Sequence, residues 1–243
     1  MLIVNFNSHN KIYPIFSRKG YTSLVKTKIT IFASLNLFTN FLFVEHAFFL
    51  QEDIVKVAEQ LLGKYLFTCI DGQLAGGIIT ETEAYQGVTD RACHAFGGRR
   101  TARNEAMYAQ GGVAYIYLCY GVHYLFNIVT NTANNPDAVL IRSIMPTHGE
   151  ELILKRTKKR QISYAVTNGP GKVTKALGIN IMHNKMPLYN LETIWLEDRQ
   201  LFIPSNKINK GTRIGVDYAG EDALLPFRFW IEKETVELLR RDN

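Results

Sequence analysis

Cysteine is scarce in this chain, and its spacing excludes two classes of site. The 243 residues contain only Cys69, Cys93 and Cys119. An odd number without C-x-x-C spacing predicts neither a disulfide framework nor a structural zinc cluster. Because no secretory signal is recognisable either, the three cysteines predict reduced thiols in a cytoplasmic protein.

Long apolar runs are also missing. The best candidate, residues 29–44, is interrupted at five polar positions, Ser34 and Asn36 among them. A membrane-spanning helix needs about 20 mostly apolar residues, so the sequence predicts no membrane association. With 47% hydrophobic residues, the chain can instead bury the core of one ordinary domain.

Acidic residues are missing from the first 44 positions. Of the 22 acidic residues, only Glu45 lies within residues 1–50, whereas that segment holds five of the 28 Lys and Arg and eight of the 14 Phe. This change in composition predicts an N-terminal extension over residues 1–44 that lies outside the functional core. The formal charge of +6 falls to +2 for the rest of the chain, so any binding site for a polyanion must be local.

The core beyond residue 45 is predicted to alternate helices and strands. Asp53 is placed to cap a helix that ends near Gly63. Residues 64–70 and 74–84 read as strands joined at Asp71-Gly72, and residues 113–130 as two strands joined near Tyr120-Gly121.

Proline, glycine and capping residues indicate the remaining helices and strands. A strand over residues 139–145 should stop at Pro146, and Thr147 with Glu150 matches a capping box that would open a basic helix. A second helix should begin near Pro170 and end before Gly178. Further strands are expected around Ile194, Arg213 and Phe227. Without repeats or low-complexity linkers, the core is predicted to be one α+β unit.

The strand over residues 74–84 carries an unusual pattern. Alternation places Glu81, Glu83 and Tyr85 on one side. A buried carboxylate is costly unless it is paired, so two acids on one face favour a chemical role. An edge strand with a solvated face would show the same pattern, and the segment by itself leaves both interpretations open.

A second unusual feature is an aromatic residue at a predicted turn. Four tyrosines lie within residues 115–124, and Tyr120 falls at the tip of the hairpin. An aromatic side chain there could project outward as a wedge that enters between bases. Without other evidence, a ring that folds back onto its own hairpin is the preferred interpretation.

The Glu81–Tyr85 strand and the Tyr120 turn belong to a longer series of short motifs that follow one another along the chain. They lie at residues 81–85, 90–94, 97–99, 103–104, 115–117, 120–121, 126–127, 140–142, 169–172, 213–216 and 219–220. Together they resemble the alkyladenine (3-methyladenine) DNA glycosylase family over about residues 45–231. Agreement of several spaced motifs is far more specific than any one of them. Residues 1–44 resemble nothing in that family.

The resemblance implies a function and a fold. A monofunctional DNA glycosylase of base excision repair would flip a damaged purine out of double-stranded DNA, hydrolyse its N-glycosidic bond and leave an abasic site. No metal or other cofactor is expected. We expect residues 45–243 to form this single α+β domain, a curved, largely antiparallel sheet or open barrel flanked by helices. A monomer in the bacterial cytoplasm or nucleoid is expected, and organellar import stays open.

The resemblance also assigns roles to particular residues. Glu83 matches the acid that activates water, and Arg142 matches its partner, whose charge would keep Glu83 deprotonated. Glu81 is assigned to structural hydrogen bonding. The base pocket is matched by Tyr85, His94, Tyr117 and Asn127. Tyr120 matches the plug that fills the space left by the base. Apart from the resemblance, Lys172 at a predicted helix start, and Arg99 and Arg103 in the loop, are expected to contact phosphates.

Other functions are weighed on the same residues. A bifunctional lyase would need an amine nucleophile, and no Lys lies in the segment of Glu83 and Tyr85. A zinc hydrolase would need closely spaced ligands, whereas Cys93, His94 and His123 are scattered. A non-catalytic damage-binding module would keep the aromatic residues but would not need Glu83. The sequence does not rank 3-methyladenine, hypoxanthine and ethenoadenine as substrates.

Overall fold

The computed structural model describes residues 43–242, and within them an antiparallel sheet of eight strands curls into a half-barrel. The main strand order is β3-β4-β5-β2-β1-β6, and β8 pairs with both β2 and β7. The strands are β1 (Tyr65–Ile70), β2 (Gln73–Tyr85), β3 (Ala114–Cys119), β4 (His123–Thr130), β5 (Asp137–His148), β6 (Ile194–Glu197), β7 (Ile208–Gly211) and β8 (Arg228–Ile231). This confirms the predicted α+β domain with a curved antiparallel sheet.

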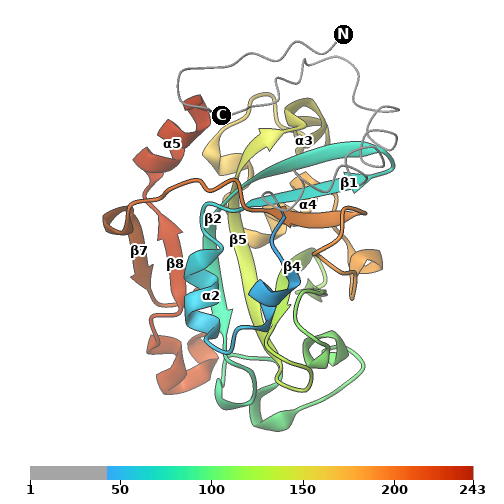
Figure 1. Ribbon diagram of the computed structural model, residues 1–243, viewed down its shortest axis with the longest axis vertical. Coiled ribbons are helices and arrows are strands. Elements are labelled where there is room, and N and C mark those ends of the chain that lie inside the picture. Colours follow the sequence, from blue (N-terminus) through green and yellow to red (C-terminus); the bar gives the residue numbers. More distant parts are fainter. Residues whose placement is uncertain (1–42, 243) are drawn as a thin grey trace. The chain divides into compact units, whose positions relative to one another are not determined.

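Helices pack against this sheet. The α-helices of the described residues are α2 (Ile54–Gln60), α3 (Glu150–Thr157), α4 (Pro170–Leu177) and α5 (Lys233–Asp242). Figure 1 shows α2 lying across the central strands, and the Thr82 hydroxyl of β2 donates to the Ala58 carbonyl of α2 at 2.8 Å. Short 3-10 turns supply most of the remaining ordered connections, including Phe96–Gly98 and Glu105–Tyr108.

Several local predictions are confirmed. The Asp53 side chain accepts a hydrogen bond from the Lys56 amide and caps α2. Asp71 and Gly72 both have positive φ, as a type I′ hairpin between β1 and β2 requires. Pro170 occupies the first turn of α4, as predicted.

Three local predictions are wrong. Pro146 does not stop β5, because it lies opposite Gly77 where the register of β2 shifts, and such irregularities tolerate a missing amide hydrogen. Thr147 belongs to β5 and caps nothing; α3 begins after Gly149, which has left-handed φ and makes no side-chain cap. Arg213 follows β7 instead of lying within a strand.

The core lies between the sheet and its helices. Its largest fully buried side chains include Phe67, Phe126 and Phe229. Phe43 forms a bridge with Glu197, and the Val44 amide donates to the Leu196 carbonyl. The rest of the predicted extension, residues 1–42, lies outside the described residues, so its boundary stays a prediction.

The close pairing of β2 with β5 gives a stability test. An added Cβ at Gly77 would overlap the Met145 carbonyl oxygen, so Gly77→Ala should lower the free energy of unfolding by about 1 to 3 kcal/mol. Urea denaturation measures this. Gly72→Asn is the control: nothing lies within 4 Å of that site, Asn tolerates positive φ, and a change of about 0.5 kcal/mol or less is expected. Equal losses in both variants would contradict the proposed overlap.

Candidate active site

Two carboxylates of β2 meet one guanidinium of β5. Arg142 Nε donates to Glu81 Oε1 at 2.9 Å, and Arg142 Nη1 lies 3.2 Å from Glu83 Oε1. A single side chain reaches both acids only if they share a face, as the predicted alternation requires. Because β2 pairs with β1, β5 and β8, it is central in the sheet, and the alternative of a solvated edge strand is excluded.

Glu83 is surrounded by donors. Besides Arg142, its Oε1 accepts the Ile214 amide hydrogen at 2.7 Å, and its Oε2 accepts the Tyr85 hydroxyl at 2.8 Å. The Glu83 side chain is 0% exposed, whereas the Arg142 side chain is 10% exposed and Ile214 is 52% exposed. The acid therefore lies directly beneath a surface that these residues help to form.

Burial and hydrogen bonding act on this carboxyl in opposite directions. Removal from water raises the pKa of Glu83, while the Arg142 charge, the Ile214 amide and the Tyr85 hydroxyl lower it. Burial is the largest effect, so the pKa stays above its ordinary value. Arg142 thus acts in the direction expected from the sequence, but it does not fully offset the cost of burying the charge.

Glu81 orients the guanidinium. Its Oε1 accepts from Arg142 Nε and also from Arg228 Nη1 of β8, the latter at 3.2 Å. Arg228 is itself held by a bond from Nε to the Thr212 carbonyl at 2.9 Å. These contacts agree with the structural role expected for Glu81, and they leave Nη1 of Arg142 directed at Glu83.

A cluster of aromatic side chains lies beside the acid. Tyr85 and Tyr117 pack against one cluster of buried side chains, and the His94 ring meets Tyr117 edge to face at 4.6 Å between centroids. The Tyr115 hydroxyl lies 2.7 Å from His94 Nδ1. Asn127 Nδ2 donates to the Tyr115 carbonyl at 3.0 Å. Of the four residues predicted for a base pocket, Tyr85 thus contacts Glu83 directly, His94 contacts Tyr117, and Asn127 is linked to His94 through Tyr115.

His94 of this aromatic cluster favours its neutral form. Burial lowers the pKa of His94, and the charges of Arg103 and Arg99 lower it further. A neutral imidazole presents no positive charge to a ligand in the pocket. The electron-rich faces of Tyr85 and Tyr117 can therefore attract a cationic ring without repulsion from His94.

The predicted wedge stands at the tip of the hairpin between β3 and β4. Tyr120 is 93% exposed and, with Gly121, has positive φ, and the Val122 amide closes the turn on the Cys119 carbonyl at 3.0 Å. The alternative that Tyr120 folds back onto its hairpin is therefore wrong. Positive φ is uncommon for an aromatic residue, and such backbone strain clusters at functional sites.

A hollow separates this tip from the start of α4. Its volume is about 280 Å³, and it is lined by Cys119, Tyr120, His123, Leu125 and residues 169–172. Lys172 Nζ donates to the Ala165 carbonyl at 3.1 Å. The structure therefore brings Tyr120 and Lys172, predicted from separate motifs, to one surface feature.

The two loop arginines are placed differently. Arg103 Nη2 donates to the Leu118 carbonyl of β3 at 3.3 Å, and its guanidinium carbon lies 5.4 Å from the Tyr117 ring centroid. The Arg99 carbonyl accepts hydrogen bonds from Asn104 and Tyr108, while its side chain is exposed. Arg103 thus contacts Tyr117 of the aromatic cluster. The Arg99 side chain belongs to the neighbouring loop, and its charge acts on His94.

The sequence of this chain is similar to that of known proteins. The family model described as methylpurine-DNA glycosylase matches residues 48–235. The chain belongs to the methylpurine-DNA glycosylase family. A Chlamydia pneumoniae protein named "Putative 3-methyladenine DNA glycosylase" is 46% identical over 191 residues, which cover 78% of this chain and 95% of that protein. A Bacillus cereus protein of the same name is 42% identical over 192 residues, with 76% and 93% covered.

Membership makes this glycosylase a hydrolase of N-glycosyl bonds that acts on DNA with damaged bases. Within residues 43–242, no helix is both long and apolar enough to cross a bilayer. The same residues hold no group of three or more His, Cys, Asp and Glu arranged for a metal ion. The expectation of a metal-free reaction stays a prediction.

Sequence reasoning missed some contacts of this glycosylase. The Ile214 amide donates to Glu83, and Arg213 pairs with Asp90. All three residues lie in the matching motifs, but the motifs do not predict these contacts. A backbone donor leaves no signature in residue type. Tyr115 was noted among four clustered tyrosines, but its hydrogen bond to His94 depends on the fold.

The opposing effects on Glu83 can be measured by carboxyl NMR titration. One signal, absent in Glu83→Gln, should titrate above the ordinary Glu pKa of about 4.3, and Arg142→Met should raise it further. Glu105 is the internal control, because the hydrogen bond from Arg100 lowers its pKa. A Glu83 signal that titrates below that of Glu105 would contradict the dominant effect of burial.

Proposed function

We propose that Glu83 activates a water molecule for hydrolysis of the N-glycosidic bond of a damaged purine flipped out of double-stranded DNA. The proposal is supported by a carboxylate that is held by Arg142, Tyr85 and the Ile214 amide and lies beside a cluster of aromatic rings, which we propose as the wall of a base pocket. The pocket supplies ring faces for a base, and the carboxylate supplies a proton acceptor.

The chemical step needs only groups of this chain. Water adds to C1′ as the bond from C1′ to the purine nitrogen breaks, and the bonding electrons go to that nitrogen, so that a cationic alkylated purine leaves as the neutral base. Glu83 takes the proton lost by the water. The Glu83 charge also stabilises the oxocarbenium-like sugar as the base departs. Arg142, held by Glu81, positions the carboxylate and the water. The products are the free base and an abasic site.

Substrate access requires a local change, because Glu83 is fully buried in this structure. Ile214 is the most exposed of the residues that hydrogen-bond or pair with Glu83. We place the sugar of the flipped nucleotide against this covering surface. Movement of the Ile214 side chain would open a path for C1′ while its amide hydrogen stays on Glu83.

The substrate class follows from the pocket and the relatives' names. Tyr85 and Tyr117 favour a cationic alkylated purine over its neutral parent by about 0.5 to 2 kcal/mol, and neutral His94 adds no repulsion. We therefore place 3-methyladenine among the substrates. Asn127 is proposed to screen the purine edge. Hypoxanthine and ethenoadenine are neutral and lack this cation–π advantage.

The remaining expectations belong to the same proposal. We propose a monomer, with residues 45–243 as the glycosylase domain. The three cysteines are unpaired, and burial raises the pKa of the Cys93 thiol to about 12. Unpaired thiols support a reducing cytoplasm. Tyr120 is proposed to fill the space left by the flipped nucleotide, and Lys172, Arg99 and Arg103 to contact phosphates.

A release assay tests the catalytic role. Purified protein is incubated with duplex DNA containing one 3-methyladenine or ethenoadenine, with EDTA present, and alkali-labile sites are counted. Glu83→Gln should bind lesion DNA but release base at least about 10²-fold more slowly. Glu59→Gln, an exposed acid on α2, is the control and should keep the wild-type rate. Binding without release by the wild type would instead indicate a damage-binding module.

A binding assay tests the wedge. Tyr120→Ser should lower affinity for lesion DNA about 10-fold or more, because an aromatic plug offsets the unstacking of the flipped base. Phe202→Ser removes a comparably exposed ring, which is 81% exposed, and should leave affinity unchanged. Wild-type retention of damaged DNA by Tyr120→Ser would rule out the wedge assignment.

A further inference from the structure

A buried ion pair lies behind the active site and has no part in the chemistry above. Arg213 Nη2 donates to Asp90 Oδ1 at 2.8 Å, and Arg213 Nη1 donates to Asp90 Oδ2. Their side chains are 0% and 2% exposed. A paired fork of this kind fixes direction as well as distance.

Asp90 also organises the loop that leads to the pocket. Its Oδ2 accepts the Gln86 amide hydrogen at 3.1 Å, and its Oδ1 accepts the Ala92 amide hydrogen at 2.9 Å. The carboxylate therefore closes a turn over residues 86–92. His94 follows two residues later, so this turn sets where the histidine enters the pocket.

Arg213 reaches the catalytic strand. Its Nη1 donates to the Ala84 carbonyl of β2 at 2.9 Å, between Glu83 and Tyr85 in the sequence. Its guanidinium carbon lies 4.9 Å from the Tyr85 ring centroid. The next residue, Ile214, gives its amide hydrogen to Glu83. One side chain thus contacts β2 directly and places the adjacent amide on the acid.

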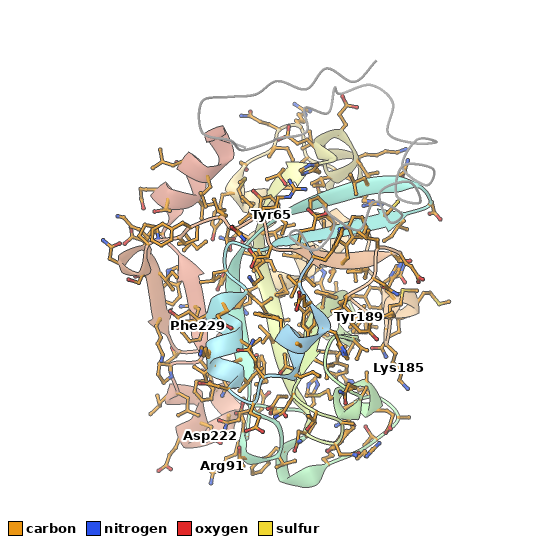
Figure 2. The ribbon with its side chains drawn as sticks, in the orientation of Figure 1. Tyr65, Arg91, Lys185, Tyr189, Asp222 and Phe229 are labelled. Atoms are coloured by element: carbon orange, nitrogen blue, oxygen red, sulfur yellow. The ribbon has the colours of Figure 1, made fainter. Side chains whose placement is uncertain are left out.

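Further contacts join the same two segments. The Arg91 amide donates to Asp222 Oδ2 at 2.8 Å, and Figure 2 shows Arg91 and Asp222 close together. The Tyr218 hydroxyl donates to the Ala92 carbonyl at 3.1 Å, and Arg213 Nη2 donates to the Asp222 carbonyl at 3.0 Å. Residues 90–92 and 213–222 therefore form one continuous contact.

We propose that Arg213 and Asp90 are positioning residues of the glycosylase reaction, which hold the Ile214 amide on Glu83 and the His94 loop against the catalytic strand. This inference rests on the proposed role of Glu83. The new element is that the position of the Glu83 carboxylate depends on the Arg213–Asp90 pair, which has no direct part in the chemical step.

Loss of the pair has a defined consequence for pH dependence. The groups that face Glu83 are Arg142 on β5, Glu81 and Tyr85 on β2, the Ile214 amide and, more distantly, Arg213; Arg228 on β8 is turned to Glu81. The Ile214 bond stabilises the charged carboxylate. When that bond is lost, the pKa of Glu83 rises, and the rising limb of rate against pH moves to higher pH.

Arg213→Lys and Asp90→Asn test the proposal. Single-turnover base release should fall about 10²-fold at neutral pH, as expected for a misplaced catalytic group, with the rate limb shifted upward by at least half a pH unit. Affinity for undamaged duplex DNA should stay within about 3-fold of the wild type, because the proposed phosphate contacts do not involve the pair. Ile153→Ala in α3, a fully buried site, matches the loss of thermal stability and should leave the pH profile in place.

If neither pair variant folds, Ile214→Pro and Ile214→Ala decide the question. They differ in the amide hydrogen, and Ile214 is half exposed and has no positive φ. Relative to the alanine variant, the proline variant should have its rate limb at higher pH, because the two variants differ in the amide hydrogen. Wild-type rate and pH profile in folded Arg213→Lys, or equal profiles in the two Ile214 variants, would overturn the inference. An inactive wild type would instead overturn the proposed function.

Discussion

The structure depends on keeping the carboxylate of Glu83 out of water. Burial of a charge is expensive, and pairing with Arg142 does not remove the whole cost, because the pKa of Glu83 stays above its ordinary value. Such a pair is weak evidence for stability. The donors around it, the Ile214 amide and the Tyr85 hydroxyl, are better understood as an arrangement that holds the two carboxylate oxygens in a fixed direction.

Much of the fold could be predicted from local chemistry. Positive φ at Asp71 and Gly72, and the cap at Asp53, follow from residue type and short-range geometry. The shared face of Glu81 and Glu83 follows from strand alternation. Predictions failed where a distant partner decides the outcome: Pro146 continues its strand because a shift in β2 lies opposite, which no local pattern reveals.

In the candidate site too, some residues could be predicted from the sequence, whereas the contacts that hold them could not. Side chains with distinctive chemistry, such as Glu83, Arg142 and Tyr120, could be selected from motifs, and the structure places the first two in contact. The Ile214 amide and the Tyr115 bond to His94 could not, since both arise from segments far apart in sequence. Residue type identifies the groups that react, whereas tertiary contacts determine how they are held.

The hairpin of β3 and β4 has a consequence for how damage is located. Tyr117, at the pocket, and Tyr120, at the exposed tip, lie on one continuous strand and turn. Three residues of extended chain span about 10 Å, and cross-strand bonds prevent this span from changing independently. With the roles proposed for these two residues, the gap in the duplex and the site of the extruded base would be separated by a fixed length, so probing a helix and sampling its bases would be one mechanical event.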